Sequence, residues 1–127
     1  MAKIIISNEY GAGFCYTNES VYVWMEIAYP GQTKVVKLAD DHWHAYRFNC
    51  PRDDEQLAEC LQALGTQETG YEVVEYDAEN FYPEIDSYDG VESVEFIPII
   101  NVDRIANCSA EEIEFYLEGL GYMCRRN

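Results

Sequence analysis

Two glycines between aromatic residues make up the segment of this chain best suited to hold a ligand. Tyr10, Gly11, Gly13 and Phe14 follow a short apolar run near the N-terminus. Glycines permit positive φ angles and close backbone approach, so the N–H groups of such a loop can face a phosphate while aromatic rings stack on a base. The same residues could equally turn the chain and pack two rings into the core. The third glycine of a dinucleotide fingerprint is absent, so both interpretations stay open.

Three arginines are candidates for gripping an anion, namely Arg47, Arg52 and Arg104. A guanidinium group binds a phosphate through two parallel hydrogen bonds, and arginine is scarce in this chain. Arg52 precedes the acidic residues 53–55 and Arg104 follows Asp103, so each could instead form a solvated ion pair.

Catalytic and metal-binding signatures are weak. The sequence has no Gly-x-Ser-x-Gly and no recognisable Cys/His signature. His42 and His44 with Cys50 could hold zinc, but no further Cys or His lies at ligand spacing. We therefore expect a protein that is not an enzyme and that carries no metal and no cofactor.

Charge is concentrated in one region. Residues 53–103 hold fifteen carboxylates and no Lys or Arg, and the whole chain has a formal net charge of −16. A block of this kind repels nucleic acid and anionic membranes, because phosphate binding needs clustered cations. It favours a basic partner, or it serves solubility alone.

Part of this block has a spacing that could imitate a nucleic-acid backbone. If Glu75, Asp77 and Glu79 lie on a strand, they repeat on one face at roughly 6.6–6.8 Å, which is of the order of the spacing between successive phosphates. Together with Glu72 they form a candidate decoy surface for a basic host protein. The alternative is a solvated sheet face.

The clearest element is a helix over residues 53–64. Apolar residues recur at helical spacing from Leu57 to Leu64, acidic residues 53–55 suit the positive end of the helix dipole, and Gly65 is placed to end it. Residues 21–28 fit a helix capped by Asn18 or Thr17, although a strand would fit nearly as well.

The remaining elements complete an α+β pattern. Ser109 and Glu112 form a capping box for a helix that ends between Gly119 and Gly121. Strands are expected over residues 3–7, 33–38, 42–48, 71–76 and 91–100, with turns at Asp40-Asp41 and Asp89-Gly90. We predict a single domain over residues 1–127, with helices packed on a largely antiparallel sheet.

Five widely spaced cysteines and the lack of a long apolar run indicate the compartment. An odd cysteine count without a Cys-x-x-Cys pair fits reduced thiols. No apolar run reaches the roughly 18 residues of a membrane span, and the run after Lys3 is too short for a signal peptide. We expect a protein of the host cell cytoplasm.

Several motifs resemble those of a family of small phage-encoded and prophage-like proteins, most of which have no assigned function. The motifs are Lys3-Ile-Ile-Ile-Ser7, Tyr10-Gly11-Ala12-Gly13-Phe14, Arg52-Asp53-Asp54 and Tyr88-Asp89-Gly90-Val91-Glu92. Their order and spacing agree with that family over residues 3–92. The resemblance implies a phage accessory protein and adds Tyr88 and Asp89 to the candidate ligand-binding residues.

The chain is also similar, more weakly, to phage anti-Thoeris sponge proteins. Those are small α+β oligomers that sequester nucleotide-derived immune signals without cleaving them. The resemblance implies a counter-defence role in which the protein binds a small nucleotide ligand. The alternative is an acidic decoy that inhibits a basic host defence protein. We also expect a homo-oligomer, because ligand sites of small domains often lie at subunit interfaces.

Overall fold

The computed structural model describes residues 1–11, 13–38, 44–101, 111, 115, 118–121 and 123–125. Within them the chain forms an α+β fold, as predicted. The strands are β1 (Ala2–Ser7), β2 (Tyr16–Thr17), β3 (Val35–Lys37), β4 (Tyr46–Phe48), β5 (Tyr71–Tyr76), β6 (Phe81–Tyr88), β7 (Val91–Asn101) and β8 (Met123–Arg125). The helices are α1 (Glu19–Ala28), α2 (Glu55–Leu64) and α3 (Thr66–Thr69).

Helix α2 forms as its periodicity predicts. Its N-cap is Asp54, whose side chain accepts a hydrogen bond from the Leu57 backbone N–H at 2.9 Å, and Gly65 ends it. Leu57 and Leu61 are almost fully buried and face β1 and β5. The helix begins at Glu55 rather than at residue 53, because Asp54 serves as the cap.

The segment after Asn18 is a helix, which resolves the ambiguity in its sequence. Asn18 caps α1 by accepting a hydrogen bond from the Val21 N–H at 3.2 Å. Val21 and Met25, one turn apart, are buried against α2 and β3. The cap and this spacing outweigh the strand preference of the Val-Tyr-Val-Trp string.

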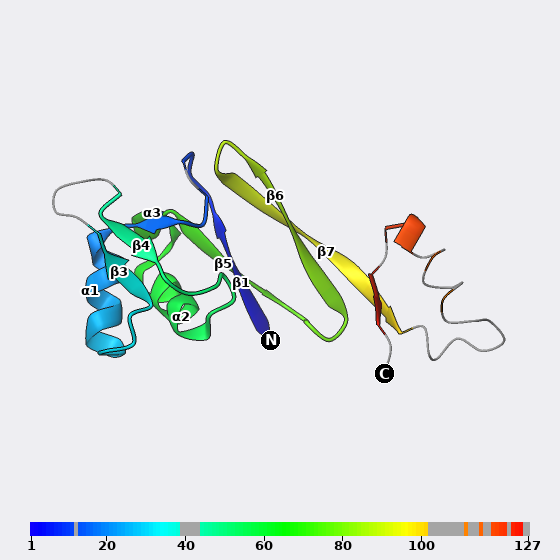
Figure 1. Ribbon diagram of the computed structural model, residues 1–127, viewed down its shortest axis with the longest axis horizontal. Coiled ribbons are helices and arrows are strands. Elements are labelled where there is room, and N and C mark those ends of the chain that lie inside the picture. The colour runs from blue at the N-terminus through cyan, green and yellow to red at the C-terminus, as the bar shows by residue number, and fades with distance from the viewer. Residues whose placement is uncertain are drawn as a thin grey trace.

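Most strand pairs are antiparallel, as expected. β1 pairs with β5 in the register Ile5↔Val73, and β4 pairs with both β2 and β3. The predicted turn at Asp40-Asp41 lies outside the described residues. Figure 1 shows β1 and β5 in the middle of the molecule, with α1 and α2 on one side.

Strands β6 and β7 form a long twisted ribbon on the other side of β1 (Figure 1). The predicted turn at Asp89-Gly90 joins them, with φ angles of 51° and 87°. Pro83 is atypical of a central strand, and β6 was not among the predicted strands. It lies at the edge of the three-stranded sheet β6-β7-β8, where proline is tolerated. The pair β7–β8 is parallel.

The predicted C-terminal helix is described at only a few positions. Glu111, Phe115, Glu118 and Gly119 are helical, whereas the capping-box residues Ser109 and Glu112 lie outside the described residues. No helix in the described part of the chain is long and apolar enough to cross a membrane.

Candidate functional site

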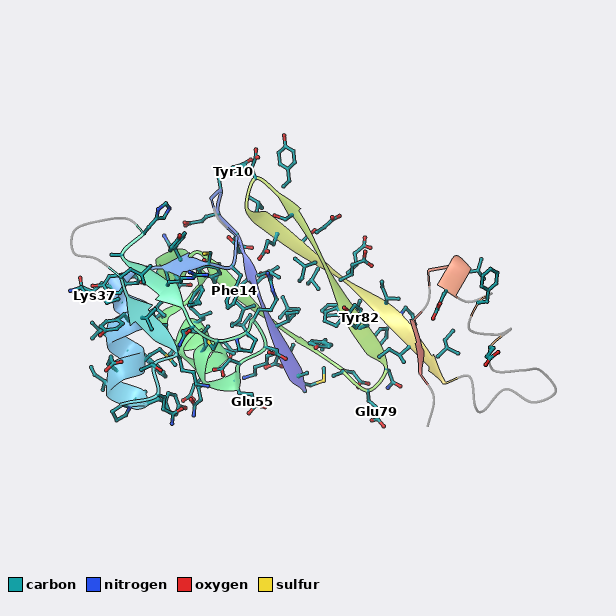
Figure 2. All side chains as sticks on the ribbon, in the orientation of Figure 1. Tyr10, Phe14, Lys37, Glu55, Glu79 and Tyr82 are labelled. Carbon is teal, nitrogen blue, oxygen red and sulfur yellow. The ribbon has the colours of Figure 1, made fainter. Side chains whose placement is uncertain are left out.

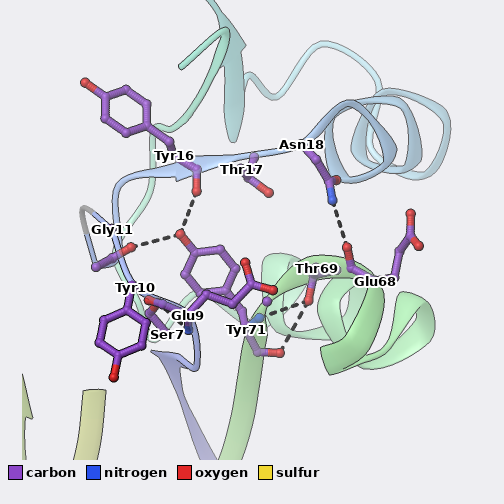
Figure 3. A pocket seen from close by; sticks show the side chains of 12 residues that line it. Ser7, Glu9, Tyr10, Gly11, Tyr16, Thr17, Asn18, Glu68, Thr69 and Tyr71 are labelled. Carbon is purple, nitrogen blue, oxygen red and sulfur yellow. Dashed lines mark hydrogen bonds between the residues drawn. The ribbon is translucent and has the colours of Figure 1, made fainter. Parts of the chain in front are cut away.

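A pocket of about 210 Å³ opens beside the predicted ligand loop (Figure 3). Three segments line it: the end of β1 with the following loop, the β2 segment leading into α1, and the junction of α3 with β5. The lining residues are Ser7, Glu9, Tyr10, Gly11, Gly13, Tyr16, Thr17, Asn18, Glu68, Thr69, Gly70 and Tyr71. The sequence predicted Tyr10, Gly11 and Gly13 as ligand-binding residues, and the structure brings all three to this pocket.

Tyr71 holds the pocket walls together. Its hydroxyl group donates toward the carbonyl oxygens of Gly13 at 2.9 Å and Tyr16 at 2.5 Å, so one buried ring ties the loop and β2 to β5 (Figure 3). Burial raises the pKa of Tyr71 to about 12. The phenol is therefore neutral at physiological pH and acts as a hydrogen-bond donor.

The pocket lining carries negative charge. Among the described residues that line it, Glu9 and Glu68 are charged and none is Lys, Arg or His. The Glu68 carboxylate accepts from the Ser20 hydroxyl at 2.9 Å, and its backbone carbonyl accepts from the Asn18 amide. Thr17 Oγ1 is buried in this wall without a hydrogen-bond partner in the described part of the chain. Buried unsatisfied groups of this kind are rare, and functional sites are one place where they occur.

Arg52 forms an internal ion pair rather than a free anion clamp. Its two terminal nitrogens lie 3.0 and 3.1 Å from the two carboxylate oxygens of Glu92, which is 8% exposed. The guanidinium also donates to the Ile5 carbonyl at 3.1 Å and lies 5.2 Å from the centre of the Phe14 ring. The alternative pairing with residues 53–55 is not what the structure shows, because Glu92 binds the guanidinium from forty residues away.

This ion pair completes the open edge of β1. The Ile5 N–H donates to the Arg52 carbonyl at 2.8 Å, and the Ser7 N–H donates to Glu92 Oε1 at 2.9 Å. These backbone groups point away from β5 and would otherwise be buried without partners. Arg52 and Glu92 therefore take the place of a neighbouring strand.

The ligand loop and the ribbon turn meet at the same junction. The Gly11 N–H donates to the Asp89 carbonyl at 2.9 Å. A Cβ atom on Gly90 would lie 2.2 Å from the Gly11 carbonyl oxygen, so only glycine allows this approach. Tyr88 is 75% exposed. The motifs of the phage-protein resemblance thus gather at one place, where they dock the ribbon onto β1.

The other predicted ligand residues lie elsewhere. Phe14 is half-buried and packs against the core, where it stacks on Phe48 with ring centres 4.5 Å apart. Arg47 is exposed on β4 opposite Val36. Arg104 lies outside the described residues. Figure 2 shows Tyr10 at the outer end of the loop and Phe14 further inside.

The proposed decoy residues do not form one evenly spaced row. β5 ends at Tyr76, so Asp77 and Glu79 lie in the turn before β6 (Figure 2). The Asp77 carboxylate accepts from the Glu79 N–H and the Asn80 amide, and the Asn80 hydrogen bond lowers its pKa. Glu72 and Glu75 are three residues apart on β5 and therefore face opposite sides. The strand spacing assumed for a phosphate mimic is wrong here.

An acidic surface does exist on the ribbon, where sequence reasoning missed it. We call it the acidic ribbon face. It consists of the exposed residues Tyr82, Glu84, Asp86, Tyr88, Ser93 and Glu95. Their alternation along β6 was the available signal, and Pro83 obscured it. On the opposite side of the ribbon, Phe96 stacks on Tyr76 at 5.1 Å.

Nucleophilic and metal chemistry find little support in the described residues. Burial raises the pKa of Cys50 to about 11 and that of Cys60 to about 12, so both thiols are protonated at neutral pH and are poor nucleophiles. No group of three His, Cys, Asp or Glu residues is arranged around a metal site in the ranges that the structure describes. His44 stacks on Tyr16, while His42 lies outside those ranges.

Comparison with known proteins gives no relative from which a function could be transferred. No protein-family model, no curated protein and no solved structure matches the chain.

Proposed function

We propose that this chain is a non-enzymatic binding protein that occupies a basic surface of another protein through its acidic ribbon face. The observation that carries the proposal is the register of the ribbon, which sets Glu84 directly opposite Glu95. Like charges at this position destabilise a strand pair by roughly 0.2–1 kcal/mol. A cationic partner would remove that cost.

The surroundings of these carboxylates support the same role. Glu84, Asp86 and Glu95 make no ion pair or hydrogen bond with other described residues. Tyr82 and Tyr88 flank them and are 47% and 75% exposed. Tyrosine is enriched at protein interfaces because its ring adds contact area while its hydroxyl hydrogen-bonds.

The resemblance to phage proteins suggests where such a partner belongs. A host defence protein or a polymerase has a basic surface that normally holds nucleic acid. Such a surface offers the positive charge that would complement the acidic ribbon face. Attraction between the two surfaces would speed association and would weaken with salt. We propose that this occurs in the host cytoplasm, without direct nucleic-acid or membrane binding.

Neutralising the face tests the proposal. The variant Glu84→Gln/Asp86→Asn/Glu95→Gln should bind the partner with roughly 10- to 100-fold lower affinity. This estimate assigns about 0.5–1 kcal/mol to each exposed charge pair. The matched control is Glu72→Gln/Glu75→Gln/Glu79→Gln, which removes three exposed charges outside the face. Basic proteins captured from bacterial lysate would be quantified for each variant and challenged with duplex DNA.

Wild type and control should retain a basic protein that DNA displaces, and the ribbon variant should not. Equal capture by the ribbon variant and the wild type would overturn the proposal. If only the control variant lost binding of the basic protein, the decoy surface would lie on β5 and the turn after it.

Sequestration of a nucleotide-derived ligand is the second candidate. Tyr10, Gly11 and Gly13 line the pocket, which supports the sponge hypothesis. The described lining residues include no cation, and Glu92 engages Arg52; both observations weigh against a phosphate group there. Mixing the protein with cyclic nucleotides and ADP-ribose derivatives, followed by heat release, tests it. Recovery of intact ligand would support this candidate and would exclude turnover.

A further inference from the structure

We infer that the pocket beside the 8–13 loop is a receptor for a small organic cation, an alkylammonium or guanidinium group on a short apolar stem. Charge favours a cation in this pocket. Glu9 and Glu68 are among its described lining residues, and none of these is Lys, Arg or His. An anionic ligand would therefore enter against repulsion, whereas a cation would be attracted.

The position of the Glu9 carboxylate also suits a cation. It lies against the α3–β5 junction, where a Cβ atom on Gly70 would be 2.8 Å from Glu9 Cδ and 2.9 Å from Oε2. Gly70 adopts φ 78°, and its carbonyl accepts from the Asn8 N–H at 2.8 Å, which fixes the start of the loop. No described group donates to the Glu9 carboxylate. Because Glu9 is exposed, a ligand can reach it.

Several hydrogen-bond donors around the pocket already have partners within the protein. The Glu9 N–H is directed to Ser7 Oγ, and the Ser7 hydroxyl donates to the Glu9 carbonyl. The Tyr71 hydroxyl serves the carbonyls of Gly13 and Tyr16. The Glu9 carboxylate and the Thr17 hydroxyl remain for a ligand, and a carboxylate acceptor suits an N–H-rich cation.

The volume of the pocket and its aromatic lining suit a small organic cation. The volume of about 210 Å³ is below the roughly 300–1,000 Å³ of pockets that enclose whole drug-sized ligands, so one side chain or a small amine fits better than a dinucleotide. Three tyrosines, Tyr10, Tyr16 and Tyr71, are among the residues that line the pocket (Figure 3). Aromatic rings attract cations and pack against an apolar stem.

The cation has two sources with the same chemistry. It is either a free amine or a Lys or Arg side chain of a protein partner. The second source rests on the proposed function. It is geometrically favourable because Gly11, in the pocket wall, contacts Asp89 at the end of the acidic ribbon face.

Calorimetric titration with agmatine and n-butylamine tests the inference directly. Both should bind saturably, whereas the neutral analogue n-butanol and the anion ADP-ribose should not. Glu9→Gln should weaken agmatine binding by roughly tenfold or more, as expected for a lost charge-assisted hydrogen bond. Glu26→Gln, which removes an exposed carboxylate from α1, is the matched control and should bind as wild type.

Amide chemical shifts locate the binding. Agmatine should shift the signals of Glu9, Gly70 and Tyr71, and the ribbon triple variant should bind agmatine normally even if the proposed partner binding fails. If Glu9→Gln also weakens capture of the basic protein, the partner supplies the cation; if capture is unchanged, a free amine does. Absence of saturable binding, equal loss in Glu9→Gln and Glu26→Gln, or preference for ADP-ribose would overturn the inference.

Discussion

The Arg52 guanidinium binds the Glu92 carboxylate of the same chain through two hydrogen bonds. The side chain of Arg52 is 29% exposed and that of Glu92 is 5% exposed. Removing one member of such a pair leaves the other charge largely buried without compensation.

We predict that the ion pair between Arg52 and Glu92 stabilises the folded protein. Arg52→Lys keeps the charge but loses the two-point contact and the hydrogen bond to Ile5, so it should lower the free energy of unfolding by about 1–3 kcal/mol. Arg47→Lys, on the exposed surface of β4, should change it by less than about 0.5 kcal/mol. Urea unfolding of both variants measures the difference. Equal stabilities would mean that the ion pair contributes nothing.

We predict that Tyr71 makes the stability of the fold depend on pH in the alkaline range. Its pKa is raised from 10.0 to about 12 in the folded protein, so the unfolded chain loses this proton first as the pH rises. Stability is therefore intact below pH 10 and falls between pH 10 and 12, by about 2–3 kcal/mol for this group. Tyr71→Phe should be less stable at neutral pH but should show a shallower decline over this range. Chemical unfolding at pH 8–12 gives both profiles, and parallel profiles would contradict the assignment.

Among the structural elements, the β6–β7 ribbon is held by a turn that tolerates only glycine at position 90. Gly90 is buried, has a positive φ angle and lies against the backbone of Gly11. The pair Asp89-Gly90 sets the turn, and the contact with Gly11 sets where the ribbon docks. The sequence predicted the turn from its local preference. The contact depends on residues almost eighty positions apart.

The Gly90→Ala variant, compared with a control, separates the strain of a positive φ angle from the steric collision with Gly11. The positive φ angle alone costs a non-glycine residue about 1–2 kcal/mol, and the collision with Gly11 should add to it, giving at least about 2 kcal/mol of destabilisation. Gly31→Ala is the matched control, because Gly31 has φ 81° and nothing within 4 Å of an added Cβ. Thermal melts should show a clearly larger loss for Gly90→Ala. Equal losses would show that the ribbon moves away at no cost.

At the scale of the whole molecule, the excess of carboxylates acts on folding and on binding in opposite directions. The net charge of −16 makes the folded chain repel itself, while the same charge attracts a basic partner. Salt screens both effects, with a Debye length of about 30 Å at 0.01 M and about 10 Å at 0.1 M.

Raising NaCl from 0.01 to 0.3 M should therefore raise the melting temperature by roughly 3–6 °C, corresponding to about 1 kcal/mol. Partner binding should weaken over the same range. The Glu84→Gln/Asp86→Asn/Glu95→Gln variant should show a smaller rise, because it begins with less repulsion. Scanning calorimetry at several salt concentrations measures this, and a flat or falling midpoint would argue against self-repulsion.

Features whose physical cause is local could be predicted from the order of the residues. Helix α2 followed from apolar spacing with Asp54 and Gly65 at its ends, the β6–β7 turn from Asp89-Gly90, and the α+β class from the mixture of periods. The loop containing Tyr10 and Gly13 was also recognisable, because glycine between aromatics is a local signal.

Which charged side chains pair with one another depends on the three-dimensional fold. Glu92 is one of fifteen carboxylates in residues 53–103, and nothing in its neighbours marks it as the one that binds Arg52. Likewise, the placement of Glu9 against Gly70 and the opposition of Glu84 to Glu95 follow from strand register and chain crossing. Electrostatic interactions depend on distance in space, and a linear sequence fixes that distance only between near neighbours.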